Sequence, residues 1–109
     1  MNHLIEKLME FRDQRNWKQF HNPKDLAISL VLEACELLEN FQWKNSEQAV
    51  QEKRNGIEEE MADVFCYLLL LSNEMGIDLE RAVLDKIEKN AEKYPESKSF
   101  GSNKKYTEL

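Results

Sequence analysis

The stretch that decides the fold is LAISLVLEACELL, residues 26–38. Ten of its thirteen residues are apolar, counting alanine and cysteine, and two of the other three are glutamates. Apolar side chains on almost every side predict a helix that is buried nearly all round. At 100° per residue, the polar side chains of this helix fall within about 60° of one another. They form one narrow stripe, made of Ser29, Glu33, Glu36 and Asn40.

A second apolar segment, residues 57–71, repeats this design. Its polar positions Glu60, Asp63 and Tyr67 form a similar stripe among aliphatic and aromatic residues. Helices joined by a short connection pack antiparallel. If the two stripes face each other, the ExxE pair of the first helix meets the ExxD pair of the second, and four carboxylates converge.

Such a cluster of carboxylates must bind protons or cations to offset the repulsion between its negative charges. Two like charges about 4 Å apart repel by about 4 kcal/mol at an effective dielectric constant near 20. All four ligands offer hard oxygen atoms, and no Cys or His stands at ligand spacing, which favours Mg²⁺ or Mn²⁺ over Zn²⁺. Carboxylate di-iron bundles use Glu-x-x-His, which neither pair provides. The structural alternative is that these acids simply face solvent in a monomeric bundle.

The remaining pattern predicts an all-α chain of four helices. Glycine and proline are scarce, with three and two residues, which favours helices with few turns. Asn22-Pro23 is typical of a helix N-terminus, and Gly76 of a C-terminus. The expected helices span about residues 4–15, 23–41, 56–75 and 78–93, with a polar connector at 42–55 that can hold a short helical turn and an extended tail at 95–109.

Composition places the chain in the class of single folded domains, residues 1–109. Hydrophobic content is 41%, charged content is 33% and the formal net charge is −6. This charge argues against a nucleic-acid polymer as partner, because such binders normally carry a basic patch. The 26–38 segment is too short to span a membrane, and no signal peptide is recognisable. We expect a cytoplasmic protein whose two cysteines, Cys35 and Cys66, are reduced core residues.

Two further patterns suit a phosphate ligand. Mg²⁺ keeps several waters and pairs with substrate phosphates, so the cluster suggests phosphoryl or nucleotidyl chemistry. Lys86, Asn90 and Lys93 share one side of the last helix, with Tyr94 next to them, and could hold a polyphosphate. A solvated lysine face is the alternative for this motif.

Aromatic residues flank the first metal helix on both sides. Trp17, Phe20 and His21 precede it, and Phe41 and Trp43 follow it. Aromatic rings near a phosphate site could stack a base. Alternatively, they pack the subunit or an oligomer interface.

Four motifs in order resemble the MazG-like nucleoside triphosphate pyrophosphohydrolases. They are WKQFHNPKDLAISLVLEACELLENFQWK, EEEMADVFCYLLLL, GIDL and KIEKNAEKYP, and the tail GSNKKYT is similar as well. Within the family, the sequence is most similar to the compact group that includes deoxycytidine triphosphate pyrophosphatase. It departs from the broader EExxE pattern at Leu32, where the compact group has the shorter ExxE.

The resemblance implies an architecture and a reaction. Each chain would have four helices, and a homodimer or homotetramer would form a helical bundle at its interface. The reaction would convert NTP and water to NMP and pyrophosphate in the presence of Mg²⁺, and would remove non-standard or surplus deoxynucleotides. Water would attack the α-phosphorus, and Glu36, with Glu33 beside it, would be the catalytic carboxylate that orients this water.

The resemblance also implies a set of site residues. The metal ligands would be Glu33, Glu36, Glu60 and Asp63. The substrate-binding residues would be Trp17, Phe20, His21, Trp43, Tyr67, Asn90 and Tyr94, with Lys44, Lys86 and Lys93 as phosphate contacts.

Two other classes of function remain open from the sequence. One is a metal-binding regulatory or storage bundle without catalysis, which would bind metal tightly but release no pyrophosphate. The other is a structural helical interaction protein, which would tolerate Glu33→Gln and ignore Mg²⁺.

Overall fold

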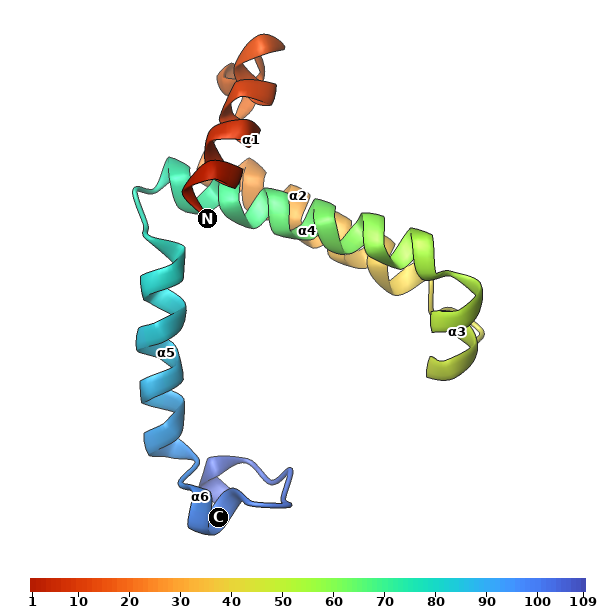
Figure 1. Ribbon diagram of the computed structural model, residues 1–109, viewed down its shortest axis with the longest axis vertical. Coiled ribbons are helices and arrows are strands. Elements are labelled where there is room, and N and C mark those ends of the chain that lie inside the picture. Colours follow the sequence, from red (N-terminus) through yellow and green to blue (C-terminus); the bar gives the residue numbers. More distant parts are fainter. The chain divides into compact units, whose positions relative to one another are not determined.

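The computed structural model describes residues 1–109, and its regular elements are all helical, as predicted (Figure 1). Four long helices confirm the four expected ones, and the predicted turn in the connector is a short helix. None of the helices combines the length and the hydropathy that a bilayer-spanning segment needs. In chain order the elements are α1 (Asn2–Gln14), the 3₁₀ helix η1 (Trp17–Phe20), α2 (Pro23–Glu39), α3 (Ser46–Glu52), α4 (Arg54–Glu74), α5 (Leu79–Lys93), α6 (Glu96–Ser99) and the 3₁₀ helix η2 (Tyr106–Glu108).

The chain divides into two compact units. The first unit is Met1–Ile77 and contains α1 to α4. The second unit is Asp78–Leu109 and contains α5, α6 and η2.

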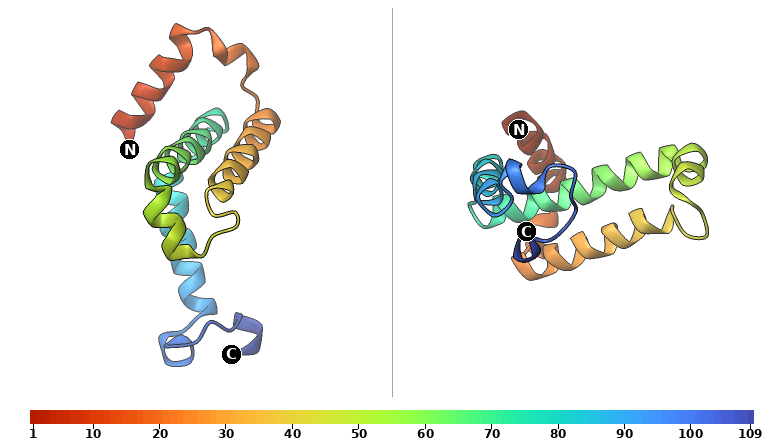
Figure 2. Two further views of the ribbon diagram at one scale, coloured as in Figure 1. Left: turned by 90° about the vertical axis from the view of Figure 1, so that its right-hand side faces the viewer. Right: turned by 90° about the horizontal axis from the view of Figure 1, so that it is seen from below.

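The first unit is built on the antiparallel pair α2 and α4, which lie side by side (Figures 1 and 2). The sequence fixes the start of α2 as predicted: the Asn22 side-chain oxygen accepts a hydrogen bond of 2.9 Å from the Asp25 amide, and Pro23 occupies the first turn. This cap satisfies an amide that has no partner within the helix. α1 and α3 both pack against α4.

The end of α4 is also set locally. Gly76 has a φ of +65°. This left-handed conformation is strained for residues that carry a Cβ atom and is freely accessible to glycine. The Ile77 amide donates to the Ser72 carbonyl at 2.8 Å, and the Gly76 amide donates to the Asn73 carbonyl at 3.2 Å. These two bonds form a Schellman motif and confirm the predicted C-terminus. Asp78 then caps α5 by accepting a hydrogen bond of 3.1 Å from the Arg81 amide.

The predicted burial of helix α2 on nearly every side is wrong for the single chain. The buried apolar residues are few: Leu26, Ala49, Leu69 and Leu70. α4 is the main neighbour of α2 and covers only one of its sides. Large apolar side chains on the uncovered side remain exposed, among them Val31 at 60% and Leu38 at 69%. Cys35 is likewise exposed rather than part of the core, and both cysteines are free thiols.

The tail is more ordered than the extended segment that the sequence predicts. Residues 96–99 form the single turn α6, in which the Phe100 amide donates to the Glu96 carbonyl at 3.0 Å, and residues 106–108 form η2. A helix of one turn is too short to show an apolar period, which is why the pattern does not reveal it.

Gly56, in the first turn of α4, allows a close approach of the two long helices. A Cβ at this position would lie 2.6 Å from the side-chain oxygen of Asn40. The Asn40 amide group donates to the carbonyls of Glu36 (3.2 Å) and Leu37 (3.3 Å) and so closes the end of α2. Asn40 therefore cannot move aside without losing hydrogen bonds.

We expect Gly56→Ala to have opposite effects in two backgrounds. In the parent, displacement of Asn40 loses its two hydrogen bonds, each worth about 1 kcal/mol. This loss exceeds the gain in helix propensity, so the free energy of unfolding should fall by about 1 kcal/mol. In an Asn40→Ala background, the higher helix propensity of alanine should raise it by up to about 1 kcal/mol. Urea unfolding of the four proteins measures this double-mutant cycle. Equal stabilisation in both backgrounds would show that the contact with Asn40 does not limit this position.

Candidate metal and nucleotide site

The structure brings three of the four predicted metal ligands together between α2 and α4. Glu33 and Glu36 come from α2, and Glu60 comes from α4. One carboxylate oxygen of each lies within 4.8 Å of the others. The two polar stripes therefore face each other, as the helical spacing predicts. Glu33 and Glu60 are half-buried, whereas Glu36 is exposed.

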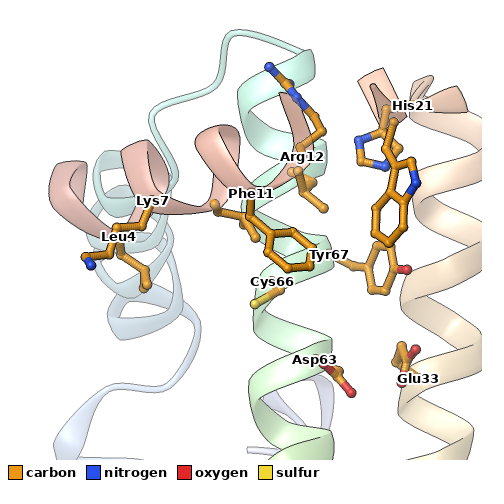
Figure 3. Close-up of a pocket in the computed structure, with 12 residues that line it drawn as sticks. Leu4, Lys7, Phe11, Arg12, His21, Glu33, Asp63, Cys66 and Tyr67 are labelled. Atoms are coloured by element: carbon orange, nitrogen blue, oxygen red, sulfur yellow. The ribbon is translucent and has the colours of Figure 1, made fainter. Parts of the chain in front are cut away.

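Asp63 lies beside this group rather than within it. It stands one turn after Glu60 on α4, and its carboxylate borders the same cavity as Glu33 (Figure 3). In the close-up, the side chains of Asp63 and Glu33 extend from the two helices into the space between them. Asp63 is near enough for its charge to raise the pKa of Glu33.

The electrostatics of the cluster fit a bound cation. Burial, followed by the neighbouring carboxyl groups of Glu36 and Glu60, raises the pKa of Glu33 to about 7. Burial also raises the pKa of Glu60, with the charge of Glu36 adding to the effect. One oxygen of Glu33 and one of Glu60 are buried without a hydrogen-bond partner. A divalent cation would supply both the missing partner and the missing positive charge, so these residues fit one.

A cavity of about 480 Å³ adjoins the carboxylates and is lined by side chains of α1, η1, α2 and α4. Its wall is largely aromatic and aliphatic, and the Trp17 ring lies edge-on to Phe11 with ring centroids 5.7 Å apart. Burial raises the pKa of the Cys66 thiol, so that part of the wall is uncharged at neutral pH. The lining residues include the predicted substrate contacts Trp17, His21 and Tyr67, together with Glu33 and Asp63.

His21 lines both this cavity and a smaller one. Trp17, His21 and Tyr67 also line a cavity of about 230 Å³, to which the predicted contact Phe20 contributes. Burial lowers the pKa of His21, and the Arg12 guanidinium lowers it further against the opposing effect of Glu74. The imidazole is therefore neutral at physiological pH, and its buried Nδ1 has no hydrogen-bond partner.

The sequence interpretation missed α1 as a wall of the cavity. Leu4, Lys7, Leu8, Phe11 and Arg12 all line it. Arg12 is only 7% exposed, and its Nε donates to the Asp13 carboxylate at 2.8 Å, which lowers the pKa of Asp13. A signal was present, because Arg12 follows Leu8 by four residues and so stands on the apolar face of the helix.

Trp43 and Lys44 belong to the first unit but do not line this cavity. Trp43 is 92% exposed, has a φ of +64° and lines neither cavity. The Lys44 Nζ lies 3.8 Å from a Glu52 carboxylate oxygen, within the connector. The four predicted contacts of α5 and its C-terminus belong to the second unit: Lys86, Asn90, Lys93 and Tyr94.

Comparison with known proteins shows three similarities. The model of the MazG-like family matches residues 28–109. The chain is 45% identical over 105 residues to dCTP pyrophosphatase 1 of Rattus norvegicus and 40% identical to that of Homo sapiens. Each alignment covers 92% of this chain and 62% of the relative, so the chain spans less than two thirds of the length of these relatives. The crystal structure of a pyrophosphatase from Archaeoglobus fulgidus superimposes with a TM-score of 0.83 at 44% identity, covering 87% of this chain and 92% of the other.

Proposed function

Because this chain belongs to the MazG-like family, we propose that it hydrolyses deoxynucleoside triphosphates to the monophosphate and pyrophosphate. Substrates would be dCTP-like or non-standard nucleotides, and the cellular role would be nucleotide house-cleaning. One observation carries the proposal: three carboxylates lie within 4.8 Å, two of them have unpartnered buried oxygens, and one of these two, Glu33, also lines a cavity with aromatic walls. The relatives named as dCTP pyrophosphatases support the choice of base.

The carboxylates of Glu33, Glu36 and Glu60, with Asp63 beside them, would hold Mg²⁺, or Mn²⁺ in its place. An all-oxygen ligand set favours these hard cations. When bound, the cation neutralises charge on the triphosphate and on the leaving pyrophosphate. The raised pKa of Glu33 means that metal binding near neutral pH also displaces a proton.

The side chains of the cavity and of the carboxylate cluster have separate tasks in this mechanism. Trp17 and Tyr67 offer faces for the base, and the neutral His21 offers an unpartnered Nδ1 to a polar group on it. Glu36, which is exposed to water, would orient the attacking water and accept its proton. The water oxygen then bonds to the α-phosphorus as the bond to the bridging oxygen breaks, and pyrophosphate leaves.

Residues of the second unit would bind the phosphate chain. Lys86, Asn90 and Lys93 recur on one side of α5, and both lysines are exposed. Two ammonium groups and an amide can neutralise and orient a triphosphate. Lys44 would add a contact from the connector.

The exposed apolar residues support assembly into a homodimer or homotetramer. A single chain leaves large apolar side chains uncovered on α2 and on α5, which is costly in water. Association through these helices would bury them in a helical bundle. The residues concerned are Ile28, Val31, Leu32 and Leu38 on α2 and Val83, Leu84 and Ile87 on α5.

A substrate screen tests the proposed function. The protein is incubated with each common NTP and dNTP and with modified deoxycytidine triphosphates, in Mg²⁺, in Mn²⁺ and in EDTA. We expect monophosphate and pyrophosphate in equal amounts, no orthophosphate, and no reaction in EDTA. Tight metal binding in calorimetry without pyrophosphate from any nucleotide would favour the alternative, a non-catalytic metal-binding regulatory or interaction protein.

Replacement of either tryptophan by alanine should weaken nucleotide binding. Trp17 lines the cavity of a single chain, and Trp17→Ala should weaken binding by about 1–3 kcal/mol, the range for a lost base–aromatic stack. We expect the same range for Trp43→Ala, because Trp43 flanks the metal-binding helix in the motif that carries the family resemblance. Equilibrium binding of a non-hydrolysable dCTP analogue and sedimentation measure affinity and oligomeric state together. If Trp43→Ala changes only the oligomeric state, Trp43 is a packing residue.

A further inference from the structure

The last residues of the chain fold back onto the C-terminal end of α5. After α6, the chain turns at Gly101, whose φ of +75° is in the left-handed region, and the Ser102 amide donates to the Ser99 carbonyl at 3.0 Å. The Tyr106 ring then lies edge-on to Tyr94, with ring centroids 6.0 Å apart and an interplanar angle of 80°. The Lys93 Nζ lies 5.1 Å from the centroid of the same Tyr106 ring. One side chain of the tail therefore contacts two consecutive residues at the end of α5.

We propose that Tyr106 is a positioning residue, which holds the Lys93 ammonium group and the Tyr94 ring in the arrangement that binds the nucleoside triphosphate. The inference rests on the proposed function, in which Lys93 and Tyr94 contact the nucleotide. A free lysine side chain loses much rotamer entropy when a phosphate fixes it. The ring face of Tyr106 attracts the ammonium group, and its edge contact restricts Tyr94, so part of this ordering precedes substrate binding.

A residue that acts in this way should affect substrate affinity and leave the chemical step unchanged. Tyr106→Leu removes the ring and keeps an apolar side chain. Tyr106→Phe keeps the ring and its π face. Phe100→Leu is the matched control, because Phe100 lies in the same tail and its side chain is 95% exposed.

The experiment measures KM and kcat of the full chain for dCTP, or for the triphosphate that the screen shows to be hydrolysed fastest, well below each melting temperature. We expect Tyr106→Leu to raise KM by about three- to tenfold and to leave kcat within about twofold of the parent. Tyr106→Phe should restore the parental KM, and Phe100→Leu should not change it. In a Lys93→Met background, Tyr106→Leu should raise KM by less than it does in the parent.

Three results would overturn the inference while the proposed function stands: a KM that is insensitive to Tyr106→Leu, an equal rise with Phe100→Leu, or an undiminished rise in the Lys93→Met background. A parent that releases no pyrophosphate from any triphosphate would refute the proposed function itself, and the inference with it. The parental assay therefore separates the two failures.

Discussion

Glu36→Gln and Asp63→Asn should each abolish measurable pyrophosphate release while the helical circular dichroism signal persists. Each change keeps the shape of the side chain and removes its charge. Loss of a general base alone slows a reaction by about 10²–10⁴-fold. Glu36 is one of the three residues whose carboxylate oxygens lie within 4.8 Å of one another, so its replacement should also weaken metal binding.

Matched substitutions on the same helices control for charge. Glu39→Gln on α2 and Glu59→Gln on α4 remove the same charge from exposed positions outside the cluster. We expect both to retain parental activity. Retained activity in Glu36→Gln or Asp63→Asn would remove that carboxylate from the mechanism.

Mg²⁺ should stabilise the folded protein strongly at pH 7–8. A ligand that binds only the folded state adds RT ln(1 + [L]/Kd), which is about 2.7 kcal/mol at a hundredfold excess over Kd. In a domain of this size that corresponds to a rise in melting temperature on the order of 10 °C. Thermal melts in Mg²⁺ and in EDTA measure the difference.

The pH dependence in EDTA follows from the raised pKa of Glu33. In the folded state this pKa is about 7, against an ordinary value of 4.5. The folded state therefore binds this proton more tightly than the unfolded state does. The resulting stability is fully present below pH 4.5 and is lost as the pH rises through about 7. Glu60, whose pKa is also raised, acts in the same direction.

The control for both effects is the double substitution Glu33→Gln with Glu60→Gln. Without the two charges, this protein should melt higher than the parent in EDTA at pH 8, respond less to pH and lose the response to Mg²⁺. If the melting temperature of the parent is the same in Mg²⁺ and in EDTA at pH 7–8, the cluster binds no metal.

Local sequence patterns were sufficient to predict most of the helices and the convergence of the carboxylates at the centre of the site. The caps at Asn22, Gly76 and Asp78 are interactions between near neighbours in sequence, so they can be identified without the tertiary structure. The convergence of the carboxylates follows from two helical stripes and one antiparallel pairing. For these features, short-range chemistry and helical period are sufficient.

The features that the sequence did not reveal depend on longer-range packing. Arg12 lines the cavity only because α1 packs against α4, a contact between segments some sixty residues apart. The burial of α2 was overestimated because apolar composition shows that a side chain needs a neighbour, and does not show whether the same chain supplies it. The contact between Tyr106 and Tyr94 depends on a turn at Gly101. The spacing of apolar residues gives no indication of this turn.

The two tryptophans have different surroundings, so their intrinsic fluorescence can be told apart. Trp17 is 45% exposed, packs against Phe11 and lines the cavity of about 480 Å³. Trp43 is 92% exposed and lines neither this cavity nor the smaller one beside it. Emission from Trp43 should be red-shifted and easily quenched by iodide, and emission from Trp17 should be bluer and more protected. Because the chain has only these two tryptophans, a Trp43→Phe variant leaves Trp17 as the single tryptophan, in the cavity wall, where its selectively excited emission can report occupancy in real time without a label.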